Sequence, residues 1–168
     1  AIIRPIVYRK RAVTPEHIKN HVLDLVAHNA PLKSILAYLV RGVEEENHER
    51  LCSILLLDKS KRFLKNYVAP SLPAGYSEAI ENLKVGPNIG SCGTAAFERR
   101  PVYVENIQTD PRWEGYKALA ASYGLASCWS MPIIVDHNDG ACTWASVHKS
   151  PKTPSAADIE QLEYLANV

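Results

Sequence analysis

The sequence predicts an α+β fold in which a central antiparallel sheet of five or six strands carries helices on its faces. Segments with helical periodicity stand at both ends of the chain, and the strand-like segments between them are joined in pairs by short turns. The chain has 168 residues, of which 46% are hydrophobic. This size suits a single domain with one hydrophobic core.

Charge and hydropathy exclude several classes of function. The 19 Lys and Arg residues nearly balance the 18 Asp and Glu residues, so no strong field favours nucleic acid or an anionic membrane. No apolar run approaches the ~20 residues that cross a bilayer. We therefore expect a cytoplasmic domain that neither binds nucleic acid nor inserts into a membrane. The first residue is not Met and the last helical pattern stops abruptly at Val168, so we also expect a longer parent protein.

The N-terminal part predicts a linker followed by two helices. Residues 1–13 mix apolar and basic residues around a proline, as a linker or tag remnant would, and the domain is expected to occupy residues 14–168. Thr14 followed by Pro15 is typical of a helix start. Apolar residues recur at helical spacing from residue 18 and, after a tight turn, over 32–43.

The part of the chain between residues 50 and 110 predicts a hairpin, a short helix and a third strand. Residues 51–57 predict a buried strand that forms a hairpin with 62–68. Residues 91–99 predict a short helix and 101–105 a short strand. These segments are separated by long Gly- and Pro-rich connections, in which residues 76–83 can form one or two helical turns. Such loops more often shape a binding site than merely join elements.

The C-terminal third predicts a helix, a hairpin and a last helix. Asp110 before Pro111 starts a helix that Gly124 ends. Strands at 127–135 and 141–149, joined through Asn138, Asp139 and Gly140, are expected at the sheet centre. Ser155 and Asp158 form a capping box for the final helix.

Three motifs in this order resemble the GAF domains of bacterial sensor proteins: GSCGTAA at 90–96, DPRW at 110–113 and CWSMPI at 128–133. The resemblance spans residues 14–168 and implies the profilin-like, PAS-related architecture of that family. It implies a sensory domain without enzymatic activity of its own, attached to a histidine kinase, a diguanylate cyclase or a cyclic-di-GMP phosphodiesterase. Two-component or cyclic-di-GMP signalling would follow. The signatures of cyclic-nucleotide and bilin binding are absent.

The glycine-rich motif predicts one half of a ligand site. Ser91, Cys92, Gly93 and Thr94 follow Gly90 at a helix N-terminus, where free backbone N–H groups can meet an anionic or carbonyl group. The alternative is that the glycines only permit close packing of this helix on the sheet.

Aromatic residues predict the other half of the site. Trp113 and Tyr116 follow the DPRW start, and Trp129 lies on the next strand, where strand alternation can direct it to either face. Together they can form the apolar wall of a small-molecule pocket. Asp110 is expected to cap its helix rather than contact a ligand.

The four cysteines lack the paired spacing of a zinc site, and we expect buried, reduced thiols at Cys52, Cys92, Cys128 and Cys142. Free methionine-R-sulfoxide reductases have GAF folds with a cysteine in a context similar to that of Cys92. Cys128 matches none of their other cysteines. A thiol at a helix N-terminus can still sense oxidants, so Cys92 and Cys128 are candidate redox residues.

His17 and His21 are spaced as a pair on one helix face, but no third metal ligand accompanies them in the sequence. The sequence therefore predicts no metal and no cofactor.

Three interpretations follow. The first is a regulatory domain in which an unidentified small molecule shifts the middle loops and biases the terminal helices, 14–43 and 155–168, toward an output domain in the same polypeptide. These helices are also expected to form a homodimer. The second is a cysteine-dependent redox sensor or a sulfoxide reductase-like enzyme. The third is a dimerisation module with a vestigial pocket.

Overall fold

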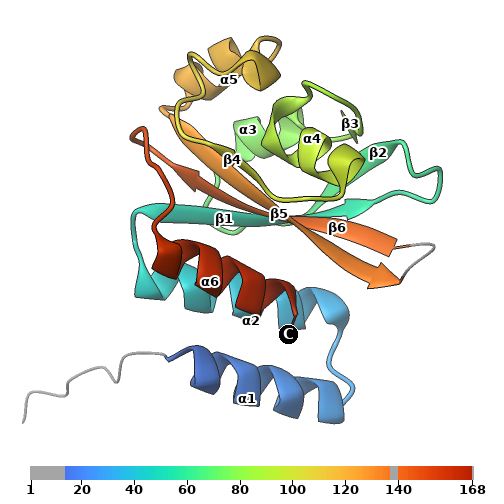
Figure 1. The fold of residues 1–168 in the computed structure, drawn as a ribbon. Helices are drawn as coiled ribbons and strands as arrows, with labels where there is room; N and C mark the ends of the chain where they lie inside the picture. The colour runs from blue at the N-terminus through green and yellow to red at the C-terminus, as the bar shows by residue number, and fades with distance from the viewer. Residues whose placement is uncertain (1–13, 137–139, 168) are drawn as a thin grey trace, which may run out of the picture.

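A six-stranded antiparallel sheet forms the centre of the molecule (Figure 1). The computed structural model describes residues 14–136 and 140–167. The strands follow the order β3-β2-β1-β6-β5-β4 across the sheet. Their bounds are β1 Arg50–Leu57, β2 Phe63–Val68, β3 Leu83–Lys84, β4 Val102–Val104, β5 Ser127–Asp136 and β6 Gly140–His148. The α+β class and the strand count are confirmed.

Pairing between β1 and β6 joins the first hairpin to the last one. Its register runs from Arg50 opposite His148 to Leu56 opposite Cys142. The sheet centre is therefore β1 with β6, whereas β5 lies between β6 and the edge strand β4. The expectation that both strands of the last hairpin lie at the centre is correct for β6 only. Asn138 and Asp139 of the predicted turn, like residues 1–13, lie outside the described residues.

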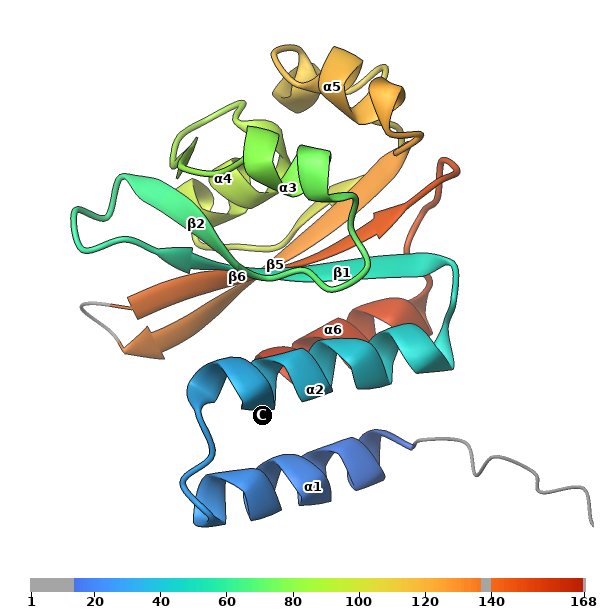
Figure 2. The same ribbon diagram turned by 180° about the vertical axis from the view of Figure 1, so that it is seen from behind.

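Helices cover both faces of the sheet (Figures 1 and 2). One face carries α2 and α6 side by side, with α1 stacked outside α2, and the other carries α3, α4, the 3-10 helix η1 and α5. Each face has its own hydrophobic core because the side chains of a strand alternate between the two faces. The helix bounds are α1 Pro15–Ala27, α2 Leu32–Glu46, α3 Ala74–Ala79, α4 Gly90–Glu98, η1 Pro111–Trp113, α5 Lys117–Ser122 and α6 Ala156–Ala166.

The predicted caps of the first and last helices are present. The Thr14 side chain accepts a hydrogen bond from the backbone N–H of His17, and Pro15 is the first residue of α1. Ser155 and Asp158 form a reciprocal capping box at the start of α6. No helix in the described part of the chain is long and apolar enough to cross a membrane.

Two elements differ from the prediction. The helix expected from Pro111 to Gly124 is split into η1 and α5, because Tyr116 has a non-helical backbone with φ −129° and ψ −7°. The two-residue strand β3, which pairs with the start of β2, is too short to leave a periodic pattern in the sequence.

Candidate functional site

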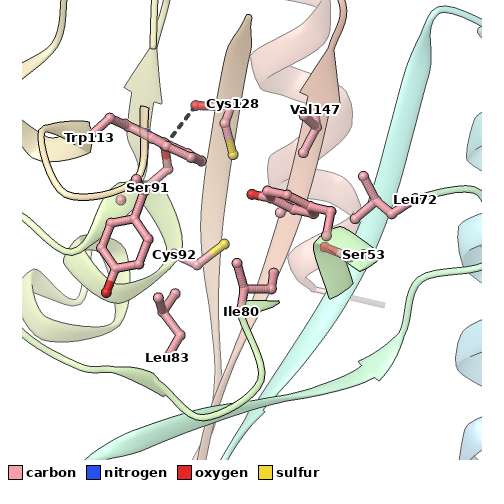
Figure 3. Close-up of a pocket in the computed structure, with 13 residues that line it drawn as sticks. Ser53, Leu72, Ile80, Leu83, Ser91, Cys92, Trp113, Cys128 and Val147 are labelled. Atoms are coloured by element: carbon pink, nitrogen blue, oxygen red, sulfur yellow. Dashed lines mark hydrogen bonds between the residues drawn. The ribbon is translucent and has the colours of Figure 1, made fainter. Parts of the chain in front are cut away.

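A small cavity lies between the sheet and the helices α3, α4 and η1 (Figure 3). Its volume is about 20 Å³, which is the space that one water-sized group needs. The described residues around it come from four strands of the sheet, β1, β3, β5 and β6, and from the segments that cover this face. They are Ser53, Leu72, Tyr76, Ile80, Leu83, Gly90, Ser91, Cys92, Trp113, Tyr116, Cys128, Ala145 and Val147.

The Ser91 hydroxyl forms hydrogen bonds that connect three elements beside the cavity. It donates a hydrogen bond to the backbone carbonyl of Cys128 over 3.0 Å and accepts one from the Trp113 indole Nε1 over 2.9 Å. Helix α4, strand β5 and η1 are therefore fixed to one another by one buried side chain. Figure 3 shows the bond from Ser91 to Cys128 with the Trp113 ring beside it.

The DPRW segment positions Trp113 from outside the cavity. The carboxylate of Asp110 accepts hydrogen bonds from the backbone N–H of Arg112 and from its guanidinium. These bonds to Arg112 hold the pKa of Asp110 below its usual value. Asp110 is thus the cap of η1, as expected, and it fixes the turn from which Trp113 enters the core.

Cys92 and Cys128 face the same space from opposite sides (Figure 3). The Oγ atom of Ser130 lies 3.0 Å from Cys92 Sγ and 4.0 Å from Cys128 Sγ. Interaction with the Cys128 thiol lowers the pKa of Cys92, against the opposing effect of burial, while the pKa of Cys128 is raised by Cys92 and by burial. Cys92 is therefore the more acidic of the two thiols.

The other two cysteines have a different environment, since both belong to the core on the opposite face of the sheet. Burial raises the pKa of Cys52 to about 12 and that of Cys142 to about 11. They are ordinary buried thiols.

Four of the seven predicted ligand-binding residues meet at the cavity, namely Ser91, Cys92, Trp113 and Tyr116. Gly93 and Thr94 do not line it. A Cβ atom on Gly93 would lie 2.5 Å from the carbonyl oxygen of Lys84, so this glycine permits close packing of α4. The Thr94 hydroxyl donates to the Gly90 carbonyl within the helix.

Trp129 lies on the opposite face of the sheet from the cavity, in the core under α2 and α6. Its indole Nε1 donates to the carbonyl of Lys152. Strand alternation directs Cys128 to the cavity and therefore its neighbour Trp129 away from it. The predicted aromatic wall consists of Trp113 and Tyr116, without Trp129.

Several residues at the cavity were missed in the sequence. Ser53 interrupts the apolar run of β1, which is the one signal that could have marked it. Tyr76 reaches the cavity from α3, and Ala145 and Val147 from β6. Their side chains are of types that fill any core, so only the three-dimensional arrangement identifies them.

A polar cluster lies on the opposite face of the sheet, centred on Arg50. The Arg50 side chain is only 1% exposed, and it binds Asp158 over 2.7 Å and Gln161 over 2.6 Å, both on α6. Its guanidinium carbon stands 5.6 Å from the Trp129 ring centroid, and the Trp129 ring lies 4.4 Å from that of His148. The first turns of α6 are thus held to β1, β5 and β6.

Comparison with known proteins gives one family and several similar structures. The family model described as "GAF domain" matches residues 29–168. A "methyl sulfide methyltransferase-associated sensor" from Methanosarcina acetivorans is 32% identical over 170 residues, which cover 99% of this chain and 17% of the relative. This chain therefore spans only a small part of that protein's length.

Two solved structures illustrate the similarity of fold. The GAF domain of a phosphoenolpyruvate-protein phosphotransferase from Coxiella burnetii superposes with a TM-score of 0.68 at 14% identity, covering 94% of each chain. The free methionine-R-sulfoxide reductase from Neisseria meningitidis, in complex with its substrate, gives a TM-score of 0.69 at 16% identity over 95% of this chain and 87% of its own. At these identities the likeness shows the fold alone.

Proposed function

Because the chain belongs to the GAF domain family, we propose that it is a regulatory, small-molecule-binding domain of a larger signalling protein and not an enzyme in its own right. The observation that carries this proposal is the small cavity on one face of the sheet, with the chain's terminal helices packed on the other. A ligand in the cavity would displace the covering segments and bias the terminal helices toward an output domain.

Neighbouring residues of β5 and β6 connect the cavity on one face of the sheet with the contacts of α6 on the other. Cys128 and Val147 line the cavity, and their chain neighbours Trp129 and His148 pack in the Arg50 cluster. Arg50 in turn binds α6. A shift of β5 or β6 at the cavity therefore moves the side chains that hold α6, without any long chain of contacts.

The parent protein is proposed to be longer than this chain, since the chain matches only 17% of the length of the sensor from Methanosarcina acetivorans. We propose a cytoplasmic histidine kinase or cyclic-di-GMP turnover protein as the parent. The proposed ligand binding by this domain is the same whichever of these two output activities the parent protein has.

Native mass spectrometry of the chain purified from cells tests the proposal. We expect a co-purifying small molecule that is lost on denaturation, and a protein mass that also reports the oligomeric state. The variant Ala145→Leu, which fills the cavity from β6, is expected to lose the molecule. A molecule retained by this folded variant would place the binding site elsewhere and contradict the proposal.

A second candidate function is favoured by the two thiols that share Ser130. In this alternative, a peroxide oxidises Cys92 and Cys128 to a disulfide: the two thiols lose two protons and two electrons, and hydrogen peroxide is reduced to two molecules of water. The lowered pKa of Cys92 favours the thiolate that starts this reaction.

Peptide mapping after peroxide treatment tests the redox alternative. We expect a Cys92–Cys128 disulfide to form, while Cys52 and Cys142 remain reduced as internal controls because burial raises the pKa of both thiols. Alkylation of Cys92 no faster than that of Cys52 would exclude this alternative.

A further inference from the structure

The walls of the cavity restrict the chemistry of its occupant. We infer that the cavity takes a compact, uncharged molecule with an apolar body and a hydrogen-bond acceptor such as a ketone oxygen. This inference rests on the proposed sensor function and names the class of ligand that the same site recognises.

Charge is the first restriction. None of the described residues that line the cavity is Asp, Glu, Lys, Arg or His, so an ion would be buried there without a counter-ion among them. Such burial costs several kcal/mol unless the charge is paired. The first turn of α4 offers an anion only the partial charge of a helix end, about half an elementary charge. A carboxylate, as the sequence suggested for this helix terminus, is therefore disfavoured.

Hydroxyl groups provide the second restriction. Ser91 is already engaged with Cys128 and Trp113. Within the described residues, by contrast, the hydroxyls of Ser53, Tyr76 and Tyr116 form no hydrogen bond. Ser53 and Tyr76 are buried residues that line the cavity, so an acceptor placed beside their hydroxyls would gain hydrogen bonds that the folded chain leaves unmade. Since burial also raises the pKa of Tyr76, its phenol stays protonated and able to donate.

Size is the third restriction. A volume of about 20 Å³ admits a small group directly, and a larger ligand must displace the covering helices. These helices are held by an edge-to-face contact of Tyr76 with Tyr123, with ring centroids 6.0 Å apart, in addition to the Ser91 bonds. A compact molecule of few heavy atoms thus binds with the least rearrangement.

Four probes of similar size separate the features of the inferred ligand. They are 2-butanone, which is neutral with an acceptor; pentane, which is neutral without one; propionate, an anion; and propylammonium, a cation. Binding to the ¹⁵N-labelled chain is followed by NMR at the Trp113 indole N–H and the Cys128 amide. We expect saturable shifts with 2-butanone, weaker binding of pentane, and a Kd at least about tenfold higher for either ion, which corresponds to ~1.4 kcal/mol.

Serine-to-alanine variants test the contribution of the donor. Ser53→Ala is expected to weaken 2-butanone binding by about three- to tenfold, the range of one net hydrogen bond, and to leave pentane unchanged. Ser34→Ala is the matched control, because Ser34 is exposed on α2 at the opposite face, and neither probe should change. Ala145→Leu is expected to abolish the shifts caused by both neutral probes.

Each contrary result has a distinct meaning. If propionate or propylammonium saturates the same resonances at lower concentration than 2-butanone, the inferred ligand class is wrong while the cavity remains a binding site. If no probe shifts these resonances at its solubility limit, the inference also fails. The native mass spectrum then decides separately whether the sensor proposal stands, because it detects any ligand that the chain carries from the cell.

Discussion

His148 is almost completely buried, and within the described residues neither of its ring nitrogens has a hydrogen-bond partner. Burial lowers its pKa to about 4, and the charges of Arg50 and Lys152 act in the same direction. The ring is therefore neutral at physiological pH and serves as an aromatic surface against Trp129.

This environment predicts a pH-dependent stability. As pH falls below about 6.5, His148 binds a proton in the unfolded state, whereas in the folded state it does so only near pH 4. The contribution of this residue to the free energy of unfolding is therefore complete above pH 6.5 and is lost as pH falls from 6.5 to 4. We expect the free energy of unfolding to fall by about 3 kcal/mol across this range, because one pKa unit corresponds to ~1.4 kcal/mol. Urea unfolding of His148→Phe should show a flatter pH profile.

The substitution keeps the aromatic contact and removes two unpartnered nitrogens, so the variant should be at least as stable as the wild type at neutral pH. His17→Phe, at an exposed position of α1, should leave the pH profile unchanged. Identical profiles for His148→Phe and the wild type would show that another group causes the loss.

At the residue scale, sequence motifs located only the part of the site that has an unusual local pattern. Ser91 and Cys92 stand out because they lie at a glycine-rich helix start. Trp113 stands out because Asp110, which caps its helix, lies three residues before it in the sequence. Ser53 and Tyr76 reach the cavity through tertiary packing, which no local pattern encodes. The face that Trp129 occupies depends on the register of its strand. A shift of one residue would move it to the other face, and the sequence alone does not distinguish the two registers.

Helix α6 is held to the sheet and to α2 by a set of polar contacts around Arg50. Asp158 caps the helix through Ser155 and binds Arg50 at the same time, and Gln161 joins Arg50 to Glu46 at the end of α2. Since this helix is the proposed connection to the output domain, the Arg50 cluster would determine how firmly the sheet holds it.

The variant Arg50→Met tests this dependence. We expect the free energy of unfolding to fall by about 2–4 kcal/mol, because a buried ion pair loses one partner, and amide exchange in α6 to accelerate more than exchange in β1 or β6. Arg100→Met removes an exposed ion pair with Glu98, and should change stability by less than about 0.5 kcal/mol. Unchanged exchange in α6 would show that its apolar contacts alone hold it to the sheet.

Most helices and strands could be predicted because their signals are local. Thr14, Pro15 and Ser155 mark helix starts by their own hydrogen-bonding chemistry, and the hairpins follow from alternation and turns. The break between η1 and α5 could not be predicted, because apolar spacing is the same on both sides of Tyr116. Strand β3 exists only through its partner β2.

For the whole molecule, we propose a homodimer through the exposed side of α1. Leu23 and Val26 are 53% and 54% exposed there, and Leu32 at the start of α2 is 56% exposed. Apolar residues clustered on an outer helix are typical of an interaction surface. Leu23→Glu with Val26→Glu is expected to convert a dimer to a monomer in sedimentation velocity, with an unchanged circular dichroism spectrum. A monomeric wild type would refute this assembly.

The alternation along β5 and β6 also restricts how this domain can change in evolution. Cys128 and Val147 belong to the cavity while Trp129 and His148 belong to the Arg50 cluster, so inserting or deleting one residue within either strand would exchange the two sets. Point substitutions can alter ligand preference on one face and leave the other intact. Diversification of ligand specificity should therefore proceed by substitution in the strands, and changes of length should be confined to the loops.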